Sequence, residues 1–211
     1  MNYFKNLKAI KGDASFRKFF RKKNKRFNSI IIFAKKEKFK NLLVYDSVNK
    51  ILNENEILAP KLYQENYNKN FIEIQDFGND TIYKILKKKG TKKFKYFQKV
   101  IKILSQIQSI KIKRIKNFKG KNYVIPKYNT TILSRETNLF YEWYARKKLP
   151  KKKIASFTKK FRKITKNLIL NLKLKNNVFV HRDFHVSNLM LVNDQIGVID
   201  SQDALIGNKA Y

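Results

Sequence analysis

The chain of 211 residues contains no cysteine and only two histidines. The first absence excludes a disulfide framework and a thiolate metal site, and the second disfavours a zinc site built from histidines. Apolar stretches such as residues 29–34 are far too short to span a bilayer. Residues 1–11 alternate Lys with apolar residues and lack the continuous apolar region of a signal peptide. We therefore expect a cytoplasmic protein that has no membrane as a partner.

Acidic residues are also scarce, since 15 Asp and Glu oppose 49 Lys and Arg, giving a formal net charge of +34. Such an excess is typical of proteins that neutralise nucleic-acid phosphates. Only eight of the basic residues are Arg, however, and the 41 Lys are spread along a chain rich in Asn, Ile, Phe and Tyr. AT-rich codons specify that composition, and base readers favour Arg. We therefore interpret the charge as a compositional bias, with non-specific nucleic-acid contact as the alternative.

The first part of the chain is predicted to be rich in strands. Apolar residues make up 43% of the sequence, which is ample for a packed core. Short apolar runs predict strands over residues 16–21, 28–34 and 71–75. Apolar residues at helical spacing predict one helix over about 41–53.

The rest of the chain is predicted to be mainly helical. Three amphipathic stripes have helical spacing, and most of their aromatic side chains are expected in a core; they lie within residues 94–104, 134–148 and 154–172. Three strands are then predicted, over residues 178–181, 189–192 and 196–199. Asn193-Asp194 supplies the turn chemistry of a hairpin between the last two.

This order predicts an α+β fold with the two-lobed layout of kinase-like phosphotransferases. Residues 1–78 would form a β-rich nucleotide-binding lobe, and residues 79–211 a helical lobe that carries the catalytic loop and the hairpin. Residues near 76–80 would connect the two lobes.

One constellation in the last part of the chain carries the chemistry. His181-Arg182-Asp183 is followed by Asn188 and, after the predicted hairpin, by Asp200. Protein kinases carry H-R-D-L-x-x-x-N before a metal-binding Asp. In phosphoryl transfer a carboxylate orients the attacking hydroxyl and accepts its proton, and this is the role predicted for Asp183. Oxygen ligands hold the Mg²⁺ that bridges the phosphates of ATP, and Asn188 and Asp200 are predicted to supply them.

Longer motifs make a resemblance specific. The segments Phe179-Val-His-Arg-Asp-Phe-His-Val-Ser-Asn-Leu-Met190 and Ile196-Gly-Val-Ile-Asp-Ser-Gln-Asp-Ala204 resemble the aminoglycoside phosphotransferase superfamily. Within it they are most similar to the bacterial kinases that phosphorylate the anomeric hydroxyl of N-acetylmuramate and N-acetylglucosamine. Gly12-Asp-Ala-Ser-Phe-Arg-Lys-Phe-Phe-Arg21 resembles the first hairpin of that group. Gln75-Asp-Phe-Gly78 resembles its hinge, and Leu133-Ser-Arg-Glu-Thr-Asn-Leu-Phe-Tyr-Glu-Trp-Tyr144 its substrate-side helix.

The resemblance implies further site residues. Three would lie in the hairpin that covers the phosphates: Gly12, Ala14 and Ser15. Residues 73–77, with Glu73, Gln75 and Phe77, would present backbone groups to adenine. Glu136 and Trp143 would face the sugar, although a helical Glu or Trp is as often a surface or core residue. Asp203 would be a second metal or substrate residue, with a plain turn Asp as the alternative.

Three departures from the family pattern qualify these expectations. No lysine stands at the usual place on the third strand, and Lys35 and Lys36 are the nearest candidates. Ser201 replaces a Phe that usually follows the metal Asp, which we expect to loosen Asp200. Relatives continue beyond the position of Tyr211, so we expect a truncated fold with an open substrate pocket, an under-buried helical lobe, poor solubility and weak activity.

The leading function is therefore an ATP- and Mg²⁺-dependent kinase of a cell-wall amino sugar. The alternatives are a kinase of another small hydroxyl compound, such as an aminoglycoside or choline, and a basic nucleic-acid-binding protein or pseudokinase with a vestigial kinase fold. A cationic substrate would favour an acidic pocket, and the scarcity of acidic residues disfavours the first alternative.

Overall fold

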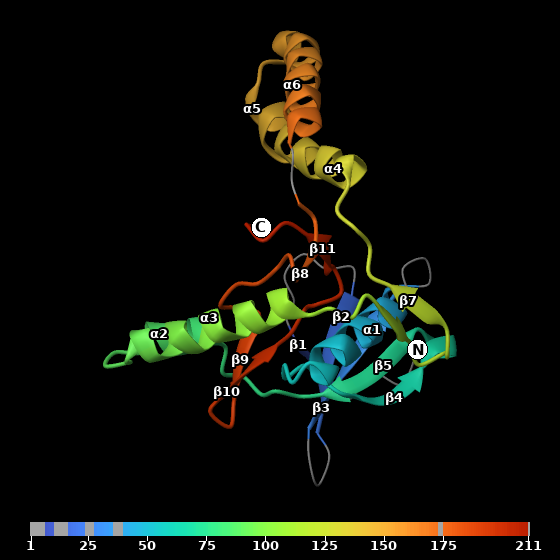
Figure 1. The fold of residues 1–211 in the computed structure, drawn as a ribbon, viewed down its shortest axis with the longest axis vertical. Coiled ribbons are helices and arrows are strands. Elements are labelled where there is room, and N and C mark those ends of the chain that lie inside the picture. Colours follow the sequence, from blue (N-terminus) through green and yellow to red (C-terminus); the bar gives the residue numbers. More distant parts are fainter. Residues whose placement is uncertain (1–6, 11–16, 24–27, 36–39, 173–174, 211) are drawn as a thin grey trace.

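The computed structural model describes residues 7–10, 17–23, 28–35, 40–172 and 175–210 (Figure 1). Gly12, Ala14 and Ser15 lie outside the described residues, so their predicted role in the phosphate-covering hairpin stays a prediction.

A five-stranded antiparallel sheet forms the first lobe, in the strand order β1-β2-β3-β5-β4. Its strands are β1 (Lys8–Ile10), β2 (Arg17–Lys22), β3 (Ser29–Ala34), β4 (Leu62–Asn66) and β5 (Phe71–Gln75), and one 3-10 turn covers Tyr67–Lys69. The central strand β3, paired with β2 and β5, is apolar because its faces are covered, and four of its six residues are buried. Helix α1 (Asn41–Glu54) packs Leu42 and Tyr45 into a cluster with β3 and β5. The predicted strands and helix of this lobe are confirmed.

The second lobe follows a connection over residues 76–81. Its helices are α2 (Ile82–Lys87), α3 (Lys93–Ser109), α4 (Thr130–Phe140), a π-helical turn (Tyr141–Ala145), α5 (Arg146–Lys148) and α6 (Lys151–Asn171). Its strands form three two-stranded sheets, β6 (Arg114–Lys116) with β7 (Asn122–Val124), β8 (Val178–Val180) with β11 (Leu205–Gly207), and β9 (Leu189–Val192) with β10 (Gln195–Val198). The predicted α+β, two-lobed arrangement is confirmed.

The β9–β10 hairpin is built as its turn residues predict. Val192 pairs with Gln195, so Asn193 and Asp194 form a two-residue loop. Both have positive φ, 47° and 64°. That combination is the signature of the tight turn whose twist matches antiparallel strands, and Asn and Asp tolerate it better than most residues do.

One apolar core joins the two lobes. It contains Val48, Ile51 and Leu52 of α1 together with Phe179 of β8 and Leu189 of β9. The boundary at residue 78 therefore separates two arrangements of secondary structure but not two independent cores.

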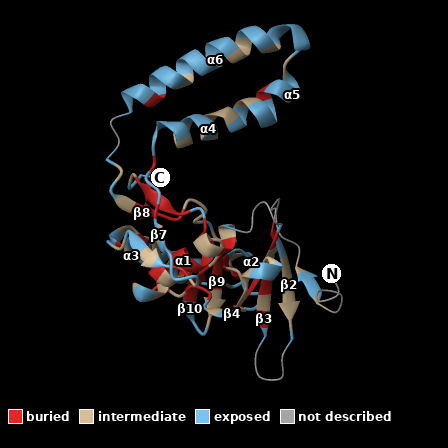
Figure 2. Cartoon of the chain, turned by 90° about the vertical axis from the view of Figure 1, so that its right-hand side faces the viewer, coloured by how far each residue is buried: buried red, intermediate tan, exposed pale blue. Residues whose placement is uncertain are grey.

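The α4–α6 segment projects from the rest of the molecule as a helical arm (Figures 1 and 2). Many of its large apolar side chains are exposed, including Leu139, Phe140, Trp143, Tyr144 and Leu168. On α3, three residues of the predicted stripe are exposed as well: Phe94, Phe97 and Ile101. The helices are where periodicity placed them, but the expectation that most of these aromatic residues lie in a core is wrong. The under-buried helical lobe that we expected is confirmed. Across the described residues, the helices fall short of the length and apolarity that a bilayer span requires.

Candidate active site

A cleft of about 600 Å³ lies between the five-stranded sheet and the β9–β10 hairpin. The sheet contributes Ile10, Arg17, Phe19, Arg21, Ile30 and Ile74, the connection contributes residues 75–79, and the second lobe contributes Ser187, Asn188, Met190, Ile199, Asp200, Gln202 and Asp203. The cleft is therefore lined by apolar side chains from both lobes and by two groups of charged side chains, Arg21 and Asp76 near the connection and Arg17 and Asp200 away from it.

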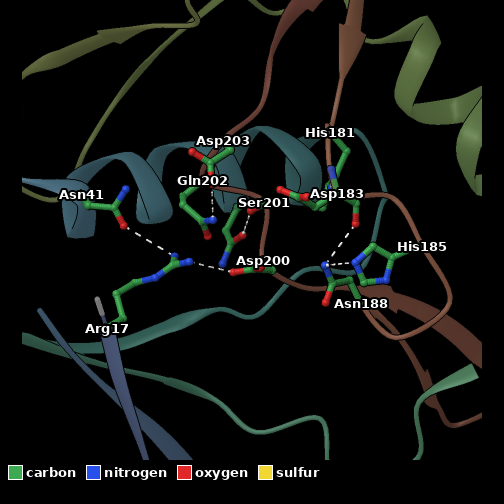
Figure 3. Close-up of polar contacts among 11 residues, drawn as sticks. Arg17, Asn41, His181, Asp183, His185, Asn188, Asp200, Ser201, Gln202 and Asp203 are labelled. Atoms are coloured by element: carbon green, nitrogen blue, oxygen red, sulfur yellow. Dashed lines mark hydrogen bonds and ion pairs between the residues drawn. The ribbon is translucent and has the colours of Figure 1, made fainter. Parts of the chain in front are cut away.

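The loop between β8 and β9 brings Asp183 and Asn188 together. The Nδ2 of Asn188 donates a hydrogen bond to the backbone carbonyl of Asp183 at 3.1 Å and lies 3.3 Å from Nε2 of His185 (Figure 3). The backbone N–H of Asn188 donates to the carbonyl of His185 at 2.8 Å. Because the amide nitrogen makes these contacts, the Oδ1 oxygen is turned away from His185 (Figure 3). This oxygen is the atom that could ligate a metal.

Asp200 lies two residues beyond the end of β10 and is tied to the same loop. The N–H of Ile199 donates to the carbonyl of Asn188 at 3.0 Å. Asp200 has φ +61° and Arg182 has φ +73°. Side chains other than Gly rarely adopt such values, and they persist where surrounding structure imposes them, often at functional sites. The Asp200 carboxylate accepts a hydrogen bond from the Arg17 guanidinium at 3.0 Å (Figure 3).

The surroundings of Asp183 favour its protonated form. Partial burial raises the pKa of this carboxyl, and the nearby carboxylates of Asp200 and Asp203 raise it further. Arg182 and His185 oppose the shift. Three acidic groups therefore share one small volume, an arrangement that a bound cation would stabilise.

His181 holds the start of the loop from inside the core. Its side chain is buried, and its Nδ1 accepts a hydrogen bond from the backbone N–H of Asp183 at 3.3 Å. Burial lowers the pKa of the imidazole from 6.5 to about 4, although the Asp200 carboxylate opposes the shift. The imidazole of His181 is therefore neutral near pH 7, and it holds the backbone at the start of this loop.

The neutral state of His181 predicts acid lability. An unfolded histidine takes up a proton near pH 6.5 and the folded one only near pH 4. The contribution of His181 is therefore fully present above pH 6.5 and is lost as pH falls toward 4, by on the order of 3 kcal/mol. His181→Asn should flatten the unfolding free energy across this window in urea titrations. An unchanged slope in His181→Asn would contradict the assignment.

Glu136 contacts the loop between β8 and β9, whereas Trp143 stands away from it. The Glu136 carboxylate forms an ion pair with Arg182, which links α4 to the loop. Trp143 stands further out on the arm, where its ring is 68% exposed and Nζ of Lys147 lies 4.8 Å from the ring centroid. Asp203 lines the cleft and accepts a hydrogen bond from Nε2 of Gln202 at 2.8 Å.

The connection between the lobes forms the other end of the cleft. Gln75 and Phe77 line it, but Glu73 does not. Glu73 pairs with Ile31 of β3 and with Gln64 of β4, so its backbone lies inside the sheet. Its buried carboxylate accepts a hydrogen bond from Ser29 at 2.6 Å. The structure therefore does not bring Glu73 to the cleft, because strands cover it on both edges.

Two contacts fix the connection in place. A Cβ added to Gly197 in β10 would lie 2.7 Å from the Phe77 ring, so the absence of a side chain there lets the ring pack against the hairpin. Arg21 of β2 pairs with Asp76 at 2.6 Å and donates to the carbonyl of Gly78 at 2.8 Å. The connection is thus held both from the sheet and from the hairpin.

Ser201 is not a loose replacement for an aromatic residue. It is fully buried, and its hydroxyl donates to Oδ1 of Asn49 on α1 at 2.6 Å. Nδ2 of Asn49 donates in turn to the carbonyl of Pro60 at 3.0 Å. The expectation that Ser201 loosens Asp200 is wrong. The buried hydrogen bonds from Ser201 to Asn49 and from Asn49 to Pro60 fix the residue next to Asp200, in place of the packing of an aromatic ring.

Sequence reasoning missed four residues around this site: Arg17, Arg21, Asn49 and Arg182. Three of them are arginines, in a chain with only eight Arg among 49 basic residues, and all three form ion pairs. In a chain whose basic residues are mostly Lys, each Arg could have been taken as a candidate for an ion pair with a carboxylate, since the planar guanidinium is suited to that pairing. Lys35, one of the candidates for the strand lysine, is exposed just beyond β3, and Lys36 lies outside the described residues.

Comparison with known proteins places this geometry in a family. Residues 6–211 match the family described as phosphotransferase enzyme family. The N-acetylmuramate/N-acetylglucosamine kinase of Neisseria meningitidis serogroup B is 28% identical over 208 residues, covering 98% of this chain and 59% of the relative. The protein of the same name from Pseudomonas putida is 25% identical over 206 residues, covering 98% and 57%. The chain thus spans somewhat less than three-fifths of the length of these relatives.

Solved structures show the same fold. The streptomycin–ATP ternary complex of APH(2")-IIa matches with a TM-score of 0.62 at 15% identity, over 96% of this chain and 67% of that one. A ternary complex of a thermostable mutant of the aminoglycoside phosphotransferase APH(4)-Ia with ADP and hygromycin B gives a TM-score of 0.63 at 13% identity, over 98% and 70%. The fold is that of the aminoglycoside phosphotransferases. With its residues matched from 6 to 211, this chain belongs to the phosphotransferase enzyme family.

Proposed function

We propose that the chain carries the nucleotide site and catalytic loop of an ATP-dependent kinase that phosphorylates a hydroxyl of a cell-wall amino sugar. The acceptor would be the anomeric hydroxyl of N-acetylmuramate or N-acetylglucosamine. The observation that carries the proposal is that Asn188 and Asp200 line one cleft, while Asp183, outside its lining, is hydrogen-bonded to Asn188 through its backbone carbonyl and lies close enough to Asp200 for the two carboxylates to interact. The names of the curated relatives support the sugar.

Each residue has a role that its surroundings suit. Asp183 would orient the sugar hydroxyl and accept its proton, and the raised pKa makes this carboxylate a stronger base than an exposed aspartate. Asn188 and Asp200 would hold Mg²⁺ through oxygen, the ligand that this hard cation prefers. When bound, the ion neutralises charge on the phosphates. Asp203, at the rim, would assist with the ion or with the substrate.

The end of the cleft at the connection would hold the adenine. Residues 75–78 continue from the last residue of β5 and line this end. Gln75 and Phe77 would present backbone groups to the base, and Ile30, Ile74 and Met190 would sandwich it. Glu136, through its pair with Arg182, stands where α4 meets the loop and would approach the sugar from the arm.

Thermal unfolding with and without nucleotide tests the proposal. Mg²⁺–ATP should raise the unfolding temperature of the wild-type chain, because a ligand that binds only the folded state stabilises it. Asp200→Asn should abolish most of that shift, since one of the metal ligands loses its charge. Asp194→Asn, the same change in the exposed hairpin turn, should keep it. The absence of a shift in the wild-type chain would contradict the proposed nucleotide site and would favour a scaffold without catalysis.

A further inference from the structure

Phosphoryl transfer needs a protein cation on the phosphates, and the usual strand does not supply one. Protein kinases place a lysine on the third strand for this purpose. Here β3 reads Ser-Ile-Ile-Ile-Phe-Ala and contains no cation. Ile30 is the β3 residue that lines the cleft, and Lys35 is exposed beyond the strand.

Arg17 on the neighbouring strand reaches the same region. It is the first residue of β2, and the alternation of the strand turns Arg17, Phe19 and Arg21 to the cleft. The Arg17 side chain is only 6% exposed. One guanidinium nitrogen lies 3.0 Å from the Asp200 carboxylate, and the other lies 3.5 Å from Oδ1 of Asn41 at the start of α1 (Figure 3). Arg17 thus connects the sheet, α1 and the metal-site carboxylate.

The other cations in the described lining of the cleft are held at the opposite end. Arg21 is paired with Asp76, and Nζ of Lys84 donates to the carbonyl of Asn79 at 2.9 Å. Both therefore belong to the connection, where the base would lie. Within that lining, Arg17 is the cation at the end that contains Asp200.

We propose that Arg17 is the phosphate-binding cation of this cleft and takes the place of the strand lysine. The inference deepens the proposed function and rests on it. A guanidinium has five donors fanned out in one plane, so it can bridge a carboxylate and a phosphate. Without nucleotide Arg17 rests on Asp200. With nucleotide, it contacts the phosphate oxygens while Asp200 serves the metal.

Binding of ADP and of adenosine, measured by calorimetry, separates a phosphate contact from a general defect. Arg17→Ala should weaken ADP binding by about 10- to 100-fold, the usual effect of losing a charge-assisted hydrogen bond. Adenosine, which has no phosphate, should bind within about 2-fold of wild type. The loss for ADP should persist in EDTA, because the contact does not pass through the metal. Arg17→Lys should restore part of the affinity, since a point charge remains.

Lys18→Ala is the matched control. It removes the same charge from the next residue of β2, where the side chain is exposed, and should leave ADP binding unchanged. The unfolding temperature of each variant without ligand shows whether Arg17→Ala still folds, and Arg17→Lys keeps the test valid if it does not.

Three outcomes would overturn the inference. Equal losses for ADP and adenosine would make Arg17 a structural residue. A loss that vanishes in EDTA would mean that Arg17 acts only through Asp200. Unchanged ADP binding in Arg17→Ala and Arg17→Lys would exclude any role in binding. In each case the wild-type chain still binds ADP, and the proposed function stands. A wild-type chain that binds no nucleotide would reject the proposed function and, with it, the role of Arg17.

Discussion

Asp183→Asn should reduce phosphate transfer from ATP to the amino sugar by about 10²- to 10⁴-fold, the usual contribution of a general base. The amide is nearly the same size as the carboxylate but cannot accept the proton of the hydroxyl. The substitution should also remove one of three crowded carboxylates. Mg²⁺–ATP should therefore still raise the unfolding temperature while turnover falls. The measurement is single-turnover transfer of the terminal phosphate at saturating ATP.

Asp194→Asn is again the matched control, because it makes the same chemical change at an exposed turn. Loss of nucleotide binding in parallel with turnover would assign Asp183 to the metal site instead. Unchanged turnover would remove it from the mechanism.

Asn49→Leu should lower the free energy of unfolding by about 2–4 kcal/mol. The change leaves the buried Ser201 hydroxyl and the Pro60 carbonyl without the partners that Asn49 supplies. Because Ser201 directly follows Asp200, the affinity for Mg²⁺–ATP should fall as well. Urea unfolding measures the first effect and calorimetric titration the second.

The double variant Asn49→Leu/Ser201→Ala provides the control. Once both polar groups of the contact are gone, no hydroxyl is left buried without that partner, so the double variant should be more stable than the sum of the single changes predicts. Strict additivity of the two single variants would show that the contact does not couple α1 to Asp200.

Local signals predicted much of this structure. The hairpin turn at Asn193-Asp194 needs only two residues that accept positive φ, and β3 is a short continuous apolar run, which is typical of a buried strand. Asp183 and Asn188 belong to one short loop, so their proximity could be predicted from their spacing in the sequence. These features depend on few residues close together in the chain.

Contacts between segments far apart in the chain could not be predicted from the sequence. Arg17 and Asp200 are 183 positions apart, and Asn49 and Ser201 are 152 apart. Periodicity likewise identified α3 and α6 as helices but said nothing about what covers them, so Phe94 and Phe97 were placed in a core although they are exposed. Amphipathic spacing specifies a face of a helix, and only the tertiary structure specifies its neighbour.

The core that joins the lobes has a consequence for synthesis on the ribosome. Val48 shares its cluster with Phe179 and Val198, which are made 131 and 150 residues later. At about 5–20 residues per second, the apolar face of α1 would wait about 7–30 seconds for these partners. During that interval the emerging first lobe presents uncovered Ile and Leu side chains to the cell. We expect nascent chains that end before residue 179 to bind chaperones strongly, and chains released after residue 206 to bind them much less.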